Sequence, residues 1–175
     1  MKKAVFLDRD GVINEVLTDR VKFVNRPDQL YFLPGVAEAI CRLNKFFDYV
    51  FVVTNQGGVG LGYMKESQLQ SIHAHMIDEL QKEGAIIEDV AYCPHKPKAG
   101  CGCRKPNSKL IEDLAKKYDV ELSSSYMVGD TDTDILAGKK AGTKAVFIGK
   151  SDPLADASFP DLLSAAKWIT EASSE

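Results

Sequence analysis

Acidic side chains follow short apolar runs in this sequence. Asp8 and Asp10 come directly after the apolar residues 4–7, and Asp130 follows the apolar residues 126–128. Residues two apart in an extended segment lean to the same side, so the Asp8 and Asp10 carboxylates are expected to lie together. Their repulsion is relieved by a divalent cation, and Mg²⁺ binds carboxylate oxygens while keeping waters and substrate phosphate as its other ligands. Asp8, Asp10 and Asp130 are therefore predicted to hold Mg²⁺.

A hydroxyl and two cations are expected at the same place. Thr54 ends the second apolar run and is followed by Asn55 and Gln56, while Arg104 and Lys105 precede a helical pattern. In a parallel sheet flanked by helices, strand ends and helix starts meet at one edge. This edge would gather carboxylates, one hydroxyl and a basic pair, a set that suits attack on a phosphate ester.

The expected chemistry assigns a role to each group. Asp8 is ionised at neutral pH, because its reference pKa is about 3.9, and needs no base to act as a nucleophile. A charge pair at about 4 Å and an effective dielectric of about 20 costs about 4 kcal/mol, so a phosphate dianion must be held by Mg²⁺ and Lys105. Asp10, its pKa raised by its neighbour, is expected to serve as acid and base. The predicted substrate-binding residues are Thr54, Asn55, Gln56, Gly57, Arg104 and Lys105.

Simpler interpretations exist for single residues. Thr54, Asp132 and Asp134 could be helix caps or turn formers, which are common after strands. Gly11 is expected to turn the chain sharply, and Arg9 to face away from the metal. A calcium loop starting at Asp130 is rejected, because its sixth and twelfth positions hold neither the required Gly nor the required Glu.

One loop carries a second metal-binding pattern. The segment "CPHKPKAGCGCRKP" contains Cys93, His95, Cys101 and Cys103. Three thiolates and one imidazole form a complete tetrahedral set, which is typical of structural zinc. We name residues 93–103 the zinc loop and expect it to influence the adjoining Arg104 and Lys105. Cys41 is expected in the core, and His73 and His75 on a helix, solvated or partly buried.

Apolar runs alternate with helical patterns along the chain. This alternation, with strands apolar on both faces, predicts an α/β fold with a doubly wound parallel sheet in one domain, residues 1–175, ending in a frayed tail at 171–175. The predicted strands are 4–7, 49–54, 90–92, 126–128 and 145–148. The predicted helices are 36–46, 66–82, 107–118, 133–141 and 162–170.

Composition narrows the class of protein. The 175 residues are 45% hydrophobic and 27% charged, with a formal net charge of −3, which gives no general attraction to nucleic acid or to acidic membranes. No apolar run has the roughly 20 residues needed to span a bilayer, and no signal peptide is expected. We therefore expect a cytoplasmic protein without nucleic-acid or membrane partners, and we expect it to be a monomer.

Four segments taken together resemble the motifs of the haloacid dehalogenase (HAD) superfamily of phosphatases. They are "DRDGV", "VVTNQ", "CRKP" and "VGDTDTD", in that order along the chain. The resemblance implies a Rossmann-like sheet in which Asp8 attacks phosphorus and Asp10 is the acid and base. It also implies that Thr54 and Lys105 hold the phosphoryl group, and that Asp8, Asp10 and Asp130 bind Mg²⁺. The short segments between the motifs leave no room for a separate cap domain, so residues 16–24, 57–62 and the zinc loop with Arg104 are expected to set specificity.

The zinc loop resembles a subfamily that includes heptose bisphosphate phosphatases and histidinol-phosphate phosphatases. The stretch "TNQGGVGLGYMKESQL" looks more like the heptose enzymes, which act in the synthesis of surface glycans. The resemblance therefore implies a small phosphorylated sugar or polyol as substrate, with histidinol phosphate as the alternative. Leu61 stands where the heptose enzymes typically carry Arg, and residues 15–27 lack a clear match to their segment after the first motif. A more remote alternative is a receiver-like domain that keeps its phosphate without turnover, although no Asp follows the third predicted strand, where such domains usually carry the acceptor.

Overall fold

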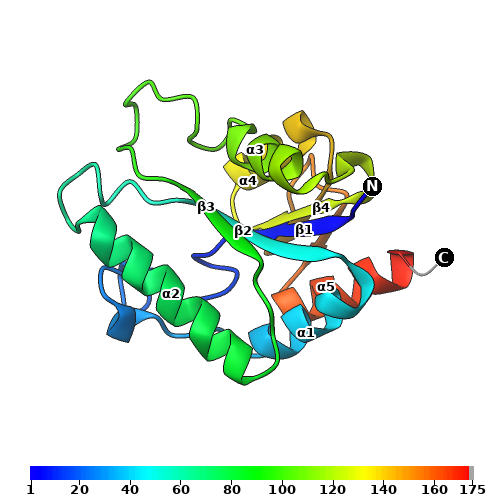
Figure 1. The fold of residues 1–175 in the computed structure, drawn as a ribbon, viewed down its shortest axis with the longest axis horizontal. Coiled ribbons are helices and arrows are strands. Elements are labelled where there is room, and N and C mark those ends of the chain that lie inside the picture. The colour runs from blue at the N-terminus through cyan, green and yellow to red at the C-terminus, as the bar shows by residue number, and fades with distance from the viewer. Residues whose placement is uncertain (174–175) are drawn as a thin grey trace.

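The computed structural model describes residues 1–173 and shows a parallel sheet of six strands (Figure 1). The strands are β1 (Ala4–Leu7), β2 (Tyr49–Asn55), β3 (Asp89–Cys93), β4 (Tyr126–Gly129), β5 (Lys144–Ile148) and β6 (Ala157–Phe159). Their order across the sheet is β3-β2-β1-β4-β5-β6. The order reverses at β1, and ligands of doubly wound sheets bind beyond the carboxyl ends of the strands at such a point. The predicted doubly wound α/β fold is confirmed.

Helices cover both faces of the sheet (Figure 1). Helices α1 (Val36–Phe46), α2 (Glu66–Lys82) and α5 (Leu162–Ser173) lie on one face, and α3 (Lys109–Tyr118) and α4 (Asp132–Ala141) lie on the other. The predicted bounds of α1 and α2 agree with the structure. Both sequences repeat their apolar residues with the spacing of one helical face, which makes such helices readable from sequence.

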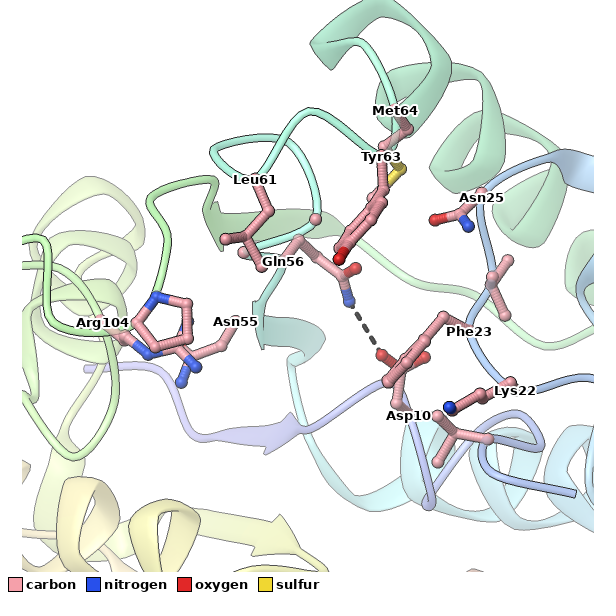
Figure 2. Close-up of a pocket in the computed structure, with 15 residues that line it drawn as sticks. Asp10, Lys22, Phe23, Asn25, Asn55, Gln56, Leu61, Tyr63, Met64 and Arg104 are labelled. Carbon is pink, nitrogen blue, oxygen red and sulfur yellow. Dashed lines mark hydrogen bonds between the residues drawn. The ribbon is translucent and has the colours of Figure 1, made fainter.

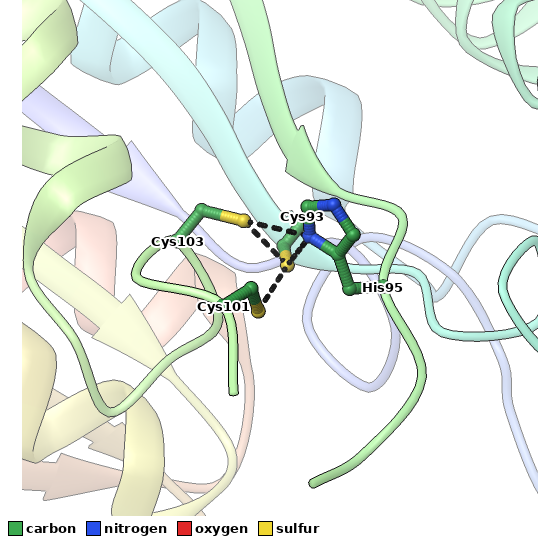
Figure 3. Close-up of side chains that lie close together, drawn as sticks. All are labelled: Cys93, His95, Cys101 and Cys103. Atoms are coloured by element: carbon green, nitrogen blue, oxygen red, sulfur yellow. Dashed lines mark hydrogen bonds between the residues drawn. The ribbon is translucent and has the colours of Figure 1, made fainter. Parts of the chain in front are cut away.

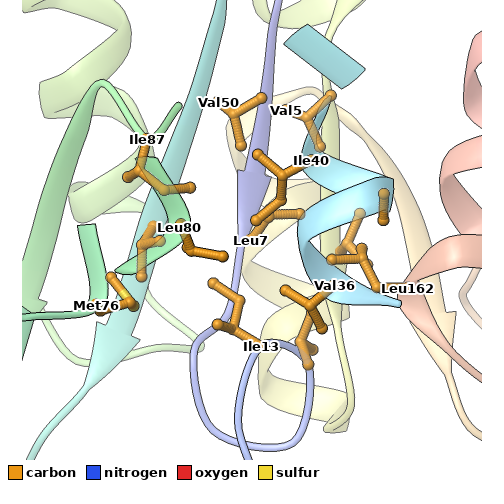
Figure 4. Close-up of a cluster of buried hydrophobic side chains, with 14 of the residues drawn as sticks. Val5, Leu7, Ile13, Val36, Ile40, Val50, Met76, Leu80, Ile87 and Leu162 are labelled. Carbon is orange, nitrogen blue, oxygen red and sulfur yellow. The ribbon is translucent and has the colours of Figure 1, made fainter. Parts of the chain in front are cut away.

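The central strands are buried on both faces because each feeds two cores. Val5 and Leu7 of β1 pack with α1, α2 and α5, whereas Ala4 and Phe6 pack with α3 and α4. Figure 4 shows side chains of α1 packed against those of β1 in the larger cluster. A fully buried aliphatic side chain contributes about 1.5–3 kcal/mol. The continuous apolar run that predicted a buried strand therefore also fixes the place where Asp8 leaves the sheet.

Several short elements differ from the prediction. The pattern gave no sign of β6 or of the 3-10 helices Pro27–Gln29 and Leu122–Ser124, because three residues are too few to display a period. Helix α3 begins at Lys109, later than predicted, and α4 begins at Asp132, one residue earlier. Helix α5 continues through Ser173, so the expected frayed tail is helical over 171–173, and residues 174–175 lie outside the described residues.

The segments that could have carried a cap domain are short. Residues 8–35, between β1 and α1, hold loops and one 3-10 helix, and residues 56–65, between β2 and α2, form a loop. The expected absence of a separate cap agrees with this arrangement, while the single-domain boundary at 1–175 stays a prediction. Within residues 1–173, no helix is both long and apolar enough to cross a bilayer.

Ile40 tests the packing of α1 on the sheet. Its side chain is fully buried, so Ile40→Ala should lower the free energy of unfolding by about 2–5 kcal/mol, through lost apolar burial and the cavity left behind. Lys45→Ala, on an exposed position of the same helix, should change it by no more than about 0.5 kcal/mol. Urea unfolding measures both. Similar shifts for the two variants would contradict this packing.

Candidate active site

Three carboxylates meet at the carboxyl edge of the sheet. Asp8 follows β1, Asp130 follows the neighbouring β4, and Asp134 lies in the first turn of α4. Their carboxylate oxygens lie within 4.8 Å of one another. Gly11 makes the approach possible, because its φ is +85° and a Cβ there would lie 1.9 Å from Asp130 Oδ2. The expected sharp turn at Gly11 is present.

Lys105 joins two of these carboxylates. Its Nζ donates to Asp8 Oδ1 at 2.9 Å, to Asp134 Oδ1 at 2.5 Å and to the Val53 carbonyl at 3.0 Å. The side chain is 3% exposed. Burial lowers the pKa of Lys105, but the charges of Asp8 and Asp134 outweigh burial and raise it above its ordinary value. Lys105 is therefore a cation at neutral pH.

The cluster holds more negative than positive charge. Burial, and then the charge of Asp134, raise the pKa of Asp8 well above its ordinary value, although Lys105 opposes them. The pKa of Asp130 is also raised, chiefly by burial. One ammonium cannot balance three carboxylates, so a hard divalent cation suits this oxygen donor set. The residues fit Mg²⁺, with Asp8, Asp130 and Asp134 as the carboxylates that could hold it.

Asp10 is held apart from this cluster. Its Oδ1 accepts hydrogen bonds from Arg9 Nε at 3.1 Å, Arg9 Nη2 at 2.9 Å and Asn14 Nδ2 at 2.9 Å. Burial raises the pKa of the Asp10 carboxyl, but Arg9 and hydrogen bonds from Asn14 and Gln56 outweigh burial and lower it. The expectation that the pKa of Asp10 is raised by Asp8 is wrong. Arg9 forms hydrogen bonds directly with the Asp10 carboxylate, and its positive charge lowers the pKa. A side-chain role for Asp10 as a magnesium ligand stays a prediction.

Gln56 and Asn55 have partners within the protein. Gln56 Nε2 donates to Asp10 Oδ2 at 3.1 Å (Figure 2). It also donates to Thr54 Oγ1 at 2.9 Å. Asn55 Oδ1 accepts from the Lys105 backbone N–H at 2.9 Å, and Asn55 Nδ2 donates to the Lys105 carbonyl at 3.2 Å. Two residues predicted to touch substrate thus also position Asp10, Thr54 and Lys105.

A cavity of about 550 Å³ opens beside Asp10 (Figure 2). Its walls come from the loop after β1, the loop after β2 and the residues around the zinc loop. The lining residues are Asp10, Val16, Lys22, Phe23, Val24, Asn25, Asn55, Gln56, Gly57, Gly58, Leu61, Tyr63, Met64, Pro97 and Arg104. The structure thus brings Gly57 and Arg104 to one cavity with Asp10, as predicted. Lys22 and Arg104 are its cations, and within residues 1–173 neither forms an ion pair.

The zinc loop gathers its four predicted ligands (Figure 3). Cys93 Sγ lies 2.7 Å from Cys103 Sγ, 3.4 Å from His95 Nδ1 and 3.5 Å from Cys101 Sγ. Burial and the Cys103 contact raise the pKa of Cys93 to about 12, while hydrogen bonds led by the Arg104 backbone overcome burial and lower that of Cys101 to about 6. Metal ligation requires thiolates, so a metal cation bound here would displace the protons that remain on the cysteine thiols. The donor set fits a tetrahedral metal.

The zinc loop also supports the cavity wall. The Gln56 N–H donates to the Cys93 carbonyl at 2.8 Å, and the Gly60 N–H donates to the Pro94 carbonyl at 2.9 Å. A Cβ on Gly60 would lie 2.5 Å from Lys96 N, so the two backbones touch at a position open only to glycine. The loop after β2 is therefore built against the zinc loop.

Sequence reasoning missed some functional residues. Asp134 was interpreted as a helix cap or turn former, but the N-cap of α4 is Thr131. Asp134 is the third residue of the helix and completes the capping box, because its Oδ2 accepts from the backbone N–H groups of Thr131 and Asp130. Its other oxygen reaches Lys105. The available signal was the spacing of four residues from Asp130, which places both at one helix end. His73 was expected to be solvated or partly buried, but it is 5% exposed and contacts Arg9.

Comparisons with known proteins find relatives among the phosphatases. The family model described as "HAD-hyrolase-like" matches residues 102–163. The chain is 41% identical over 148 residues to D-glycero-beta-D-manno-heptose-1,7-bisphosphate 7-phosphatase of Rhodopseudomonas palustris, covering 81% of this chain and 80% of that protein. It is 38% identical over 180 residues to the alpha-anomer enzyme of Mycobacterium bovis, covering 98% and 93%.

A solved structure shares the whole fold. The crystal structure of D,D-heptose 1,7-bisphosphate phosphatase from B. bronchiseptica, complexed with magnesium and phosphate, superimposes with a TM-score of 0.87 at 33% identity, covering 97% of this chain and 99% of that one. Sequence identity above 30% across most of both chains, together with the shared fold, settles the relationship. The chain belongs to the heptose-1,7-bisphosphate 7-phosphatase family of the haloacid dehalogenase superfamily, a family of phosphate ester hydrolases.

Proposed function

We propose that this protein is a Mg²⁺-dependent phosphomonoesterase that removes the 7-phosphate of D-glycero-D-manno-heptose 1,7-bisphosphate through an aspartyl-phosphate on Asp8. The contact of Lys105 Nζ with Asp8 and Asp134 carries the proposal, because it places nucleophile, cation and metal-binding carboxylates at one point. The names of the relatives supply the substrate. They include enzymes for the alpha and for the beta anomer, so the proposal covers both.

The first step forms a bond between an Asp8 carboxylate oxygen and phosphorus. The bond from phosphorus to the sugar oxygen breaks, and that oxygen keeps the electron pair and takes a proton from the Asp10 carboxyl. Lys105 and Thr54 hold the phosphoryl oxygens during this transfer. When bound by Asp8, Asp130 and Asp134, Mg²⁺ supplies the positive charge that lets a carboxylate approach a phosphate.

The second step reverses the proton movement. Asp10 takes a proton from water, the water oxygen attacks phosphorus, and the bond from phosphorus to Asp8 breaks to regenerate the carboxylate. The lowered pKa of Asp10, caused chiefly by Arg9 against the effect of burial, makes it a carboxylate at rest. A phosphate anion beside it raises its proton affinity, because like charges disfavour the ionised form. Substrate binding thereby prepares Asp10 to act as the acid first.

The cavity suits a substrate with charge at both ends. Its volume of about 550 Å³ accommodates a sugar, and Asp10 marks the end at which the ester is cleaved. Lys22 and Arg104 line the same cavity and form no ion pair within residues 1–173. We assign them to the phosphate that is not cleaved. Leu61, which stands where the heptose enzymes typically carry Arg, gives this cavity no positive charge. Lys22 lines the same cavity and supplies one.

We further propose a cytoplasmic monomer without nucleic-acid or membrane partners. The net charge of −3 supports the absence of nucleic-acid and acidic-membrane partners, because it provides no general attraction to polyanions. Lys22 and Arg104, which line the cavity and form no ion pair within residues 1–173, are a local concentration of positive charge.

A panel of phosphate esters tests the function. The wild-type protein with Mg²⁺ should release phosphate over many turnovers from heptose 1,7-bisphosphate and leave the 1-phosphate in place, as measured by phosphate release and NMR of the product. Histidinol phosphate should be turned over at least about tenfold less efficiently, because its single phosphate leaves Lys22 and Arg104 unused. Asp8→Asn is the inactive control. A preference for histidinol phosphate, or one turnover only, would contradict the proposal.

Lys22 should act on the bisphosphate alone. Lys22→Met is expected to raise KM for heptose 1,7-bisphosphate by up to about fivefold, since one exposed charge contact is worth up to about 1 kcal/mol. KM for the heptose 7-phosphate should change by less than about twofold. Lys22→Arg should restore the bisphosphate KM, and Lys140→Met, on the exposed surface of α4, is the control. An equal rise for both sugars would remove Lys22 from the distal phosphate.

We propose that Cys93, His95, Cys101 and Cys103 bind a structural Zn²⁺. The support is the tetrahedral donor set, with all four ligand atoms within 4.8 Å of one another. Structural zinc contributes apparent binding energies of about 10–16 kcal/mol in small peptides, which is ample to order a loop with little core of its own. Because Cys103 adjoins Arg104 and Lys105, zinc would also fix the phosphate-binding cations.

Loss of zinc should therefore impair catalysis in the presence of Mg²⁺. Cys101→Ser is expected to reduce bound zinc and to lower kcat/KM by about tenfold or more, because the support for Lys105 and Gly60 loosens. Zinc content is measured by elemental analysis and activity by phosphate release in excess Mg²⁺. Cys41→Ser, the same substitution outside the cluster, should retain both. Full activity in zinc-depleted protein would contradict the coupling.

A further inference from the structure

Arg9 is a buried cation next to the catalytic centre. It is 0% exposed, the largest side chain to be fully buried. Its Nε and Nη2 donate to Asp10 Oδ1, and its Nη1 lies 3.0 Å from His73 Nε2. A guanidinium has only donors, so this third contact requires His73 Nε2 to be the acceptor. Arg9 therefore connects Asp10 to a residue of helix α2.

His73 is built as a neutral acceptor. It is 5% exposed, and its ring lies against Tyr92 of β3, with centroids 5.8 Å apart. Burial, and then the charge of Arg9, lower the pKa of His73 to about 3. A neutral imidazole offers one unprotonated nitrogen, and the contact with Arg9 fixes that nitrogen as Nε2. Burial and the contact with Tyr92 fix the His73 ring, and its Nε2 can therefore fix the position of Arg9.

Without His73, Arg9 would have an unpaired donor in the core. An unpaired buried donor of a charged group is costly, so the guanidinium would turn toward another acceptor or toward solvent. Either movement changes the two bonds that Arg9 makes to Asp10 Oδ1. Asn14 and Gln56 would still reach Asp10, but neither carries charge.

We propose that His73 is a positioning residue for proton transfer, which acts by fixing Arg9 and, through Arg9, the carboxylate of Asp10. This inference rests on the proposed role of Asp10 as acid and base. His73 lies on the helix that follows the loop lining the cavity, so the same contact ties the cavity wall to the catalytic carboxylate. His73 touches no reacting atom.

Two substitutions separate the acceptor from the ring. His73→Phe keeps a ring against Tyr92 but has no acceptor, and His73→Gln keeps an acceptor but has no ring. His73→Phe should lower kcat/KM for the sugar bisphosphate by about tenfold or more with KM changed by less than about twofold, and His73→Gln should recover most of the loss. His75→Phe, at a less buried position of the same helix, is the matched control.

The leaving group provides a readout that a structural defect would not produce. The sugar alkoxide needs the proton of Asp10, whereas nitrophenolate leaves without one. The fall in kcat/KM for His73→Phe should therefore be at least about fivefold larger with the sugar ester than with 4-nitrophenyl phosphate. Independently of turnover, NMR should detect a slowly exchanging Arg9 side-chain N–H in the wild type that is lost in His73→Phe.

Each outcome decides the proposal. Equal losses on both esters, an unaffected His73→Phe, or a persistent Arg9 signal in that variant would overturn it. If His73→Phe does not fold, His73→Gln decides the proposal. A folded His73→Gln whose kcat/KM falls much more with the sugar ester than with 4-nitrophenyl phosphate would overturn it. A wild type that hydrolyses other sugar phosphates but not heptose bisphosphate would overturn the proposed substrate and leave this comparison intact. A wild type that hydrolyses no ester would overturn both.

Discussion

One buried ammonium holds the site together. Lys105 Nζ lies 2.9 Å from Asp8 and 2.5 Å from Asp134, in a place where 3% of its side chain is exposed. Removing one partner of such a buried pair costs about 3–5 kcal/mol, because the other charge is left uncompensated. The end of β1, the start of α4 and the segment after the zinc loop must therefore meet at this point. The carboxyl edge of a doubly wound sheet satisfies that requirement where the strand order reverses.

Lys105 is placed by contacts of its main chain as well as by its charge. Asn55, the last residue of β2, forms hydrogen bonds with both the N–H and the carbonyl of Lys105. The next residue, Gln56, is bonded through its N–H to the carbonyl of Cys93, where the zinc loop begins. Lys105 follows no strand, but these hydrogen bonds fix its position relative to β2 and β3. The position of the Lys105 ammonium consequently depends on the zinc loop being ordered, although that loop supplies none of the carboxylates that Lys105 contacts.

The sequence predicted the sheet and the gathering of Asp8, Thr54 and Asp130, because buried parallel strands are continuous apolar runs and their ends share one edge. It placed Lys105 with them because helices start at the same edge. It predicted from residue type and spacing alone the cluster of Cys93, His95, Cys101 and Cys103 that the structure brings together. The sequence could not predict which individual side chains contact one another. A capping pattern explained Asp134 locally, so nothing in the sequence indicated that its second oxygen reaches across to another loop.

Arg9 shows why the acidities of the two carboxylates could not be read from their spacing. Mutual repulsion would treat Asp8 and Asp10 alike, yet the pKa of Asp8 is raised and that of Asp10 lowered. Burial acts in the same direction on both, so the difference comes from their partners. Asp8 shares one cation with Asp134, whereas Asp10 has Arg9 on two of its hydrogen bonds. The difference in pKa between the adjacent acids is therefore set by how many carboxylates share each cation, which only the folded arrangement determines.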